Sequence, residues 1–70
     1  MSTELVREAL KDGRRIALIR CYDGAGSTVV ELEAQDTGAR RFYQFVTATE
    51  AFRFVQEAVL AMQYLGCQVN

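Results

Sequence analysis

The alternation of apolar and polar residues along the chain predicts two helices and three strands. Thr3–Lys11 carries apolar residues spaced as on one side of a short helix, and Asp12-Gly13 would end that helix. Three later segments are rich in strand-forming residues and are separated by short turns. These segments are Arg14–Tyr22, Thr28–Ala34 and Arg40–Val46. Short turns between neighbouring strands predict a three-stranded antiparallel meander.

The C-terminal segment Thr47–Leu65 predicts a long helix. Thr47 with Glu50 three residues later forms a capping box, and Gly66 is a typical residue after a helix end. At about 100° per residue, ten apolar positions share an arc of roughly 180°, wider than the stripe of about 100° that one small sheet covers. Those positions are Ala48, Ala51, Phe52, Phe54, Val55, Ala58, Val59, Ala61, Met62 and Leu65. The surplus predicts a second partner, either the N-terminal helix or another chain.

The strand patterns predict which side chains face this helix. Glu31 and Glu33 should face solvent, which turns Val30 and Leu32 towards the helix. The segment 40–46 is apolar at both parities, so its orientation stays open. The opposite sheet face would then carry several apolar residues, and an exposed apolar patch usually marks a contact site. With two helix residues outside the arc, the predicted interface is Ile16, Leu18, Tyr22, Val29, Phe42, Val46, Leu60 and Tyr64.

Composition narrows the possible chemistry. The 70 residues (1–70) allow one domain, and a net charge of −1 gives no overall attraction for nucleic acid. Histidine is absent, which removes the commonest general base and metal ligand, so we expect no enzyme activity, no cofactor and no metal. Cys21 and Cys67 are expected to be free thiols of a cytoplasmic protein, because no secretion signal or membrane-spanning run is present.

Four arginines form the one candidate anion site. Arg14 and Arg15 begin one predicted strand, Arg40 and Arg41 begin another, and the meander would place both pairs at the same end of the sheet. Their guanidinium groups could hold phosphates of a nucleic acid, with sheet aromatics stacking on bases. The alternative is that they are solvated strand ends, neutralised by nearby acidic residues.

The predicted order α-β-β-β-α resembles the double-stranded-RNA-binding domain over the whole chain, at the level of topology. That family contacts phosphates through a lysine-rich start to its second helix. The matching stretch here, Thr47–Arg53, has one cation and one acid. The resemblance therefore implies a fold and does not supply the RNA-binding residues.

Together these patterns predict an α+β fold: a three-stranded meander with a long C-terminal helix on one face and a short N-terminal helix. The predicted function is a small cytoplasmic homodimer that acts as an interaction or regulatory module. Nucleic-acid binding through the arginines is the alternative. A membrane partner is not expected.

Overall fold

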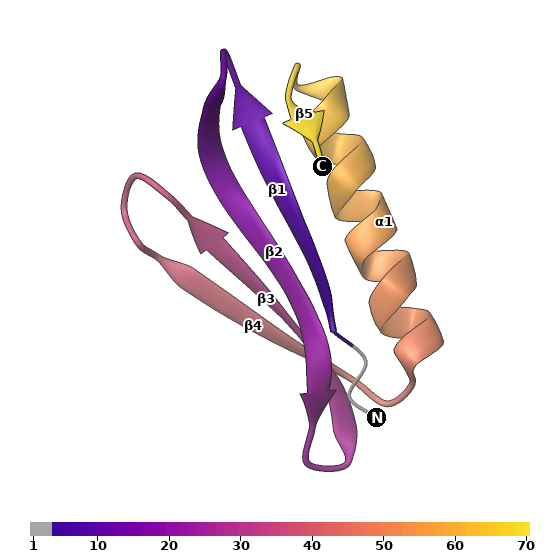
Figure 1. The fold of residues 1–70 in the computed structure, drawn as a ribbon. Coiled ribbons are helices and arrows are strands. Elements are labelled where there is room, and N and C mark those ends of the chain that lie inside the picture. The colour runs from indigo at the N-terminus through magenta and orange to yellow at the C-terminus, as the bar shows by residue number, and fades with distance from the viewer. Residues whose placement is uncertain (1–3) are drawn as a thin grey trace.

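The computed structural model describes residues 4–70 as a five-stranded antiparallel sheet with one helix across one face (Figure 1). The strands lie in the order β4-β3-β2-β1-β5. Their bounds are β1 Leu5–Lys11, β2 Arg14–Gly24, β3 Ser27–Ala34, β4 Arg40–Phe45 and β5 Gln68–Val69, and the helix α1 spans Ala48–Tyr64. The result is a two-layer molecule of 38 × 22 × 19 Å.

The predicted N-terminal helix is wrong: the described part of that segment is the strand β1. Its predicted first residue, Thr3, lies outside the described residues. Asp12 and Gly13, expected to end a helix, instead form a two-residue hairpin turn between Lys11 and Arg14. Their φ angles are 54° and 78°, and positive values at both central positions are what a type I′ hairpin turn requires. After this turn the chain reverses direction as β2, which pairs with all seven residues of β1.

The prediction of three strands is also wrong, because β1 and β5 extend the meander to five. β2 carries an extra residue, Ile16, where the register with β1 shifts beside Ala9 and Leu10. After the helix, β5 returns to pair with β1 at the sheet edge. The order α-β-β-β-α and its likeness to the double-stranded-RNA-binding domain therefore do not hold.

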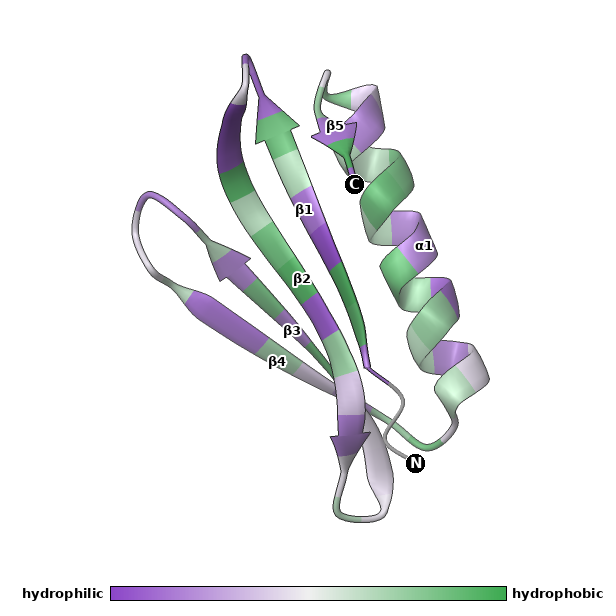
Figure 2. Ribbon diagram, in the orientation of Figure 1, coloured by the Kyte–Doolittle hydropathy of each residue, from purple (hydrophilic) through white to green (hydrophobic). Residues whose placement is uncertain are grey.

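The core lies between α1 and the central strands. Ile19, Cys21 and Val30 are fully buried, and Ala51 and Val55 of α1 cover them. Apolar residues accordingly run along β1 and β2 and recur along the helix (Figure 2).

The orientation of β4, left open by its sequence, is set by contacts with one helix residue. The ring centroids of Tyr43 and Phe45 lie 4.8 and 5.3 Å from that of Phe54. Tyr43 and Phe45 therefore face the helix, and Phe42 lies on the opposite side of the sheet.

Both ends of α1 are capped by the residues that the sequence indicated. Thr47 is the N-cap, and its hydroxyl accepts a hydrogen bond from the Glu50 amide at 3.2 Å. Beyond the C-terminus, Gly66 has a φ of 93°, its amide donates to the Gln63 carbonyl, and the Cys67 amide donates to the Met62 carbonyl, both at 3.0 Å. This pair of bonds is a Schellman motif, which satisfies carbonyls that the helix leaves free.

Candidate functional site

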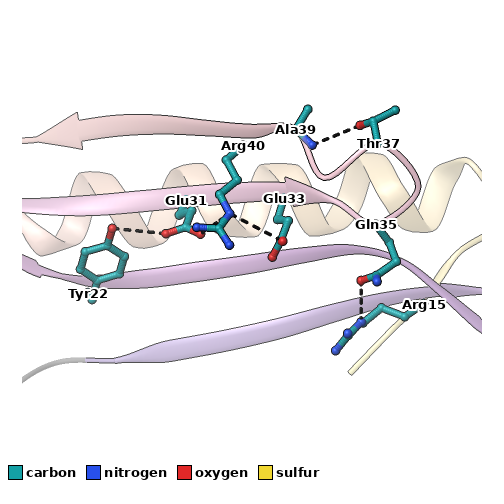
Figure 3. Close-up of polar contacts among 8 residues, drawn as sticks. All are labelled: Arg15, Tyr22, Glu31, Glu33, Gln35, Thr37, Ala39 and Arg40. Atoms are coloured by element: carbon teal, nitrogen blue, oxygen red, sulfur yellow. Dashed lines mark hydrogen bonds and ion pairs between the residues drawn. The ribbon is translucent and has the colours of Figure 1, made fainter.

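The sheet face opposite α1, called here the outer face, is crossed by a polar network. Glu31 lies on the face predicted for it, but the prediction that it faces solvent is wrong: its side chain is buried, and the Tyr22 hydroxyl donates to its carboxylate at 3.4 Å (Figure 3). The Arg40 guanidinium lies 3.9 Å from Glu31 and 3.6 Å from Glu33. Arg20 of β2 lies directly opposite Glu31 in the register, yet Glu31 forms its ion pair with Arg40 of β4, the strand on the other side of β3. The centre of the outer face is therefore charge-balanced.

The apolar residues predicted for this face do not form one exposed patch. Leu18 and Val29, at its centre, are buried by neighbouring side chains although no second layer covers them. Ile16, Phe42 and Val46 are exposed, but they lie at the margins, on the bulge of β2, on β4 and after β4. The polar network and the neighbouring side chains thus cover Leu18 and Val29, whereas Val6, Ile16, Phe42 and Val46 stay exposed and separate from one another around them.

A cluster of exposed apolar side chains lies instead at the C-terminal end of α1. Leu60, Tyr64 and Leu65 expose 58%, 91% and 67% of their surface, and Ala61 between them is also exposed. These positions are linked on the helix surface because 60 and 64, and 61 and 65, are four residues apart, and 61 and 64 are three apart. We call these four residues the helix-end patch. The sequence pattern placed Leu60 and Tyr64 outside the predicted apolar arc, and Ala61 and Leu65 within it.

The four arginines of the candidate anion site are not gathered into one cluster. Arg40 pairs with Glu33 of β3, and Glu33 pairs with Leu18 of β2, so Arg40 is level with Leu18. Arg15 lies three residues from Leu18 along β2, a distance of about 10 Å. Arg15 pairs with Glu8 at 3.1 Å and also donates to Gln35. Within residues 4–70, Arg14 and Arg41 form no ion pair.

The two thiols are both free and buried. Burial, and secondarily the charge of Asp23, raise the pKa of the Cys21 thiol. A raised pKa disfavours the reactive thiolate, so Cys21 has the character of a core residue. Across residues 4–70, no cluster of acidic and cysteine side chains could hold a metal ion.

Comparison with protein-family models, with curated proteins and with solved structures finds no match for this chain. Among residues 4–70, no helix is long and apolar enough to cross a membrane.

Proposed function

We propose that this chain is a homodimeric interaction module without catalytic activity of its own, and that two copies associate through the helix-end patch. The observation that carries this proposal is the exposure of three large apolar side chains, Leu60, Tyr64 and Leu65, on the last turn of α1 and its C-cap. Single exposed apolar residues are ordinary, whereas adjacent ones mark contact surfaces.

The patch suits a two-fold interface. Two α1 helices can pack in antiparallel orientation, with Leu60 and Tyr64 of one copy against the same residues of the other. Scaling a full burial energy of about 1.5–3 kcal/mol per large apolar side chain by the exposed fractions gives about 6–13 kcal/mol for both copies. The free-energy cost of association is about 4–15 kcal/mol, which is similar to this gain. Surface beyond the patch must therefore also be buried for a stable dimer.

The total surface of the chain supports such an additional area. It exposes 4997 Å², whereas a compact monomer of 7.9 kDa is expected to expose about 4400 Å². The difference of about 600 Å² approaches the roughly 800 Å² that each partner buries in a standard interface. Dimerisation would reduce this excess.

Sedimentation of the wild-type chain over a range of concentrations tests the proposal. We expect a monomer–dimer equilibrium whose dissociation constant rises about 100-fold or more in the double variant Leu60→Lys/Tyr64→Lys, because dimerisation would bury two unpaired charges per copy. Val46→Lys and Phe42→Lys are matched controls that place the same charge at exposed apolar sites outside the patch. A wild-type monomer at all concentrations would refute dimerisation. Disruption by Phe42→Lys alone would move the interface to the β4 margin.

A second candidate is nucleic-acid binding through Arg14 and Arg41, which are exposed and have no acidic partner within residues 4–70. This function predicts retention on heparin at low salt that the double variant Arg14→Glu/Arg41→Glu abolishes. Arg53→Glu, an exposed cation on α1, is the control. We rank it second because Arg15 and Arg40 are already paired with carboxylates.

A further inference from the structure

β4 forms the edge of the sheet opposite β5 and lies in the middle of the chain, between β3 and α1 (Figure 1). Among residues 4–70, β3 is the one strand that pairs with it. The register between the two strands runs without a shift from Arg40 to Phe45, so β4 carries no bulge. A regular strand at the edge of a sheet is a template for pairing with another chain.

The backbone of β4 alternates between β3 and the free edge. The Ala34 amide donates to the Ala39 carbonyl at 2.9 Å, which marks these two residues as a hydrogen-bonded pair. Such pairs recur at every second position of an antiparallel ladder, so Arg41 and the odd-numbered residues after it bond to β3. The even-numbered residues direct their amides and carbonyls away from β3, to the free edge. These residues are Arg40, Phe42 and Gln44.

Two exposed side chains of β4, Phe42 and Arg41, lie on opposite faces of the sheet. Phe42 lies on the outer face and exposes 57% of its surface. Arg41 has the parity of Tyr43 and therefore lies on the helix-facing side, where it is exposed and forms no ion pair within residues 4–70. The β4 edge thus combines an exposed aromatic ring with an unneutralised positive charge.

We propose that the β4 edge binds an extended, acidic segment of a partner protein, which adds to the sheet as an antiparallel strand. The residue of this segment opposite Phe42 exchanges two backbone hydrogen bonds with it and projects to the outer face, because opposite residues in a ladder share a face. The next residue of the segment lies opposite Arg41 and projects to the helix-facing side. That position is a non-hydrogen-bonded pair, in which the two side chains come closer together.

The side chains of the edge define the sequence of the segment. A β-branched apolar residue opposite Phe42 would cover part of its exposed ring. An acidic residue opposite Arg41 would give the guanidinium group the carboxylate that it lacks among residues 4–70. A second copy of the chain cannot supply that carboxylate from its own β4, which contains two arginines and no acidic residue. The motif, read from the N-terminus of the segment, is therefore apolar–acidic.

Titration of the ¹⁵N-labelled chain with the peptide Ac-Thr-Thr-Val-Glu-Thr-NH₂ tests this proposal by NMR. We expect the amides of Phe42 and Gln44 to shift and to become protected from hydrogen exchange, while the amides of β1 stay unchanged. N-methylation of the peptide's valine removes the donor to the Phe42 carbonyl and should weaken binding about tenfold. N-methylation of its glutamate, whose amide would point away from β4, is the matched control and should weaken binding less.

The charge of the edge is tested separately. A peptide with lysine in place of glutamate should bind more weakly, and Arg41→Glu should reverse that preference. Arg14→Glu changes an exposed cation on β2 and should leave the preference as it is. The proposal rests on the proposed role as an interaction module but uses a surface that shares no residue with the helix-end patch. The peptide should therefore bind equally well to Leu60→Lys/Tyr64→Lys, and a failure of dimerisation would not affect this result.

Four results would overturn the proposal. The first two are no shift of Phe42 with millimolar peptide and equal weakening by the two N-methylations. The third is equal binding of the glutamate and lysine peptides. The fourth is a Phe42 shift that follows protein concentration without peptide, which would assign the β4 edge to a second copy of the chain.

Discussion

Replacing Thr47 by alanine removes the N-cap of the one helix that covers the core. The Thr47 hydroxyl accepts from the Glu50 amide and lies 3.2 Å from the Glu50 carboxylate, to which it donates. In Thr47→Ala the Glu50 amide loses its acceptor at the helix end. Loss of such a cap costs about 1 kcal/mol, with a range of about 0.5–2 kcal/mol.

This loss is large for a chain of this size. A 70-residue domain has a free energy of unfolding of about 3.5–10 kcal/mol, so one cap is a tenth to a third of the total. The corresponding fall in Tm is about 4–8 °C. Thermal unfolding followed by far-UV circular dichroism, at one fixed protein concentration, measures it directly.

Two variants decide whether the hydroxyl is the cause. Thr47→Ser keeps the oxygen acceptor and should remain within about 0.5 kcal/mol of the wild type. Thr49→Ala makes the same change at an exposed position inside the helix, where the described structure shows no hydrogen bond of the hydroxyl. The reasoning fails if Thr47→Ser is as destabilising as Thr47→Ala, or if Thr49→Ala lowers Tm equally.

Three further predictions concern the core, the helix end and pH. Ile19→Ala opens a cavity at a fully buried site and should lower the free energy of unfolding by about 2–5 kcal/mol. A decrease of less than about 1 kcal/mol, measured by urea titration, would contradict the tight packing of Ile19. Gly66→Ala forces a side chain to a φ of 93° and should cost about 1–2 kcal/mol, so an unchanged Tm would refute the Schellman ending. The raised pKa of Cys21 favours its protonated form in the native state, so the stability it contributes is complete below its usual pKa of 9.0 and is lost as pH rises through the native value. The free energy of unfolding in urea should therefore be lower at about pH 10 than at about pH 7. In Cys21→Ala the difference between the free energies at these two pH values should be smaller.

The later part of the fold could be predicted because local signals there agree with tertiary structure. The strand segments, the long helix and its caps at Thr47 and Gly66 each have a turn or capping residue where the sequence pattern changes. The alternation around Glu31 also indicated the side of the sheet that faces the helix. In the structure Val30 is fully buried against that helix.

The first strand was missed because its residues fit a helix as well as a strand. Leu5 and Ala9 are four apart, which suits a helix side, and they are also an even number apart, which suits a strand face. Pairing with the long strand β2 outweighs the helical preference of the leucine, alanine and glutamate residues in this segment. Asp12-Gly13 was the signal that could have decided it, because Asp-Gly is a strong hairpin signal as well as a plausible helix end.

The free edge of the sheet depended on that missing strand. With β1 assigned to a helix, the part of β1 that β5 leaves unpaired could not be foreseen. The two residues of β5 are too few to give a sequence pattern. The burial of Leu18 and Val29 was also unpredictable, because it comes from side chains of neighbouring strands rather than from alternation along one strand.

The attachment of β5 gives the edge of the sheet an adjustable length. β5 has two residues, whereas β1 and β2 pair over seven positions, so β5 is the strand with the fewest bonds to lose. Detachment of Gln68–Val69 would free the backbone of β1 as far as Leu10 while leaving the β1–β4 meander intact. The open edge would then grow from the three residues before Glu8 to six, long enough for a full strand of another chain. Hydrogen exchange at Asn70, whose amide donates to Glu8, would report how often this longer edge is available.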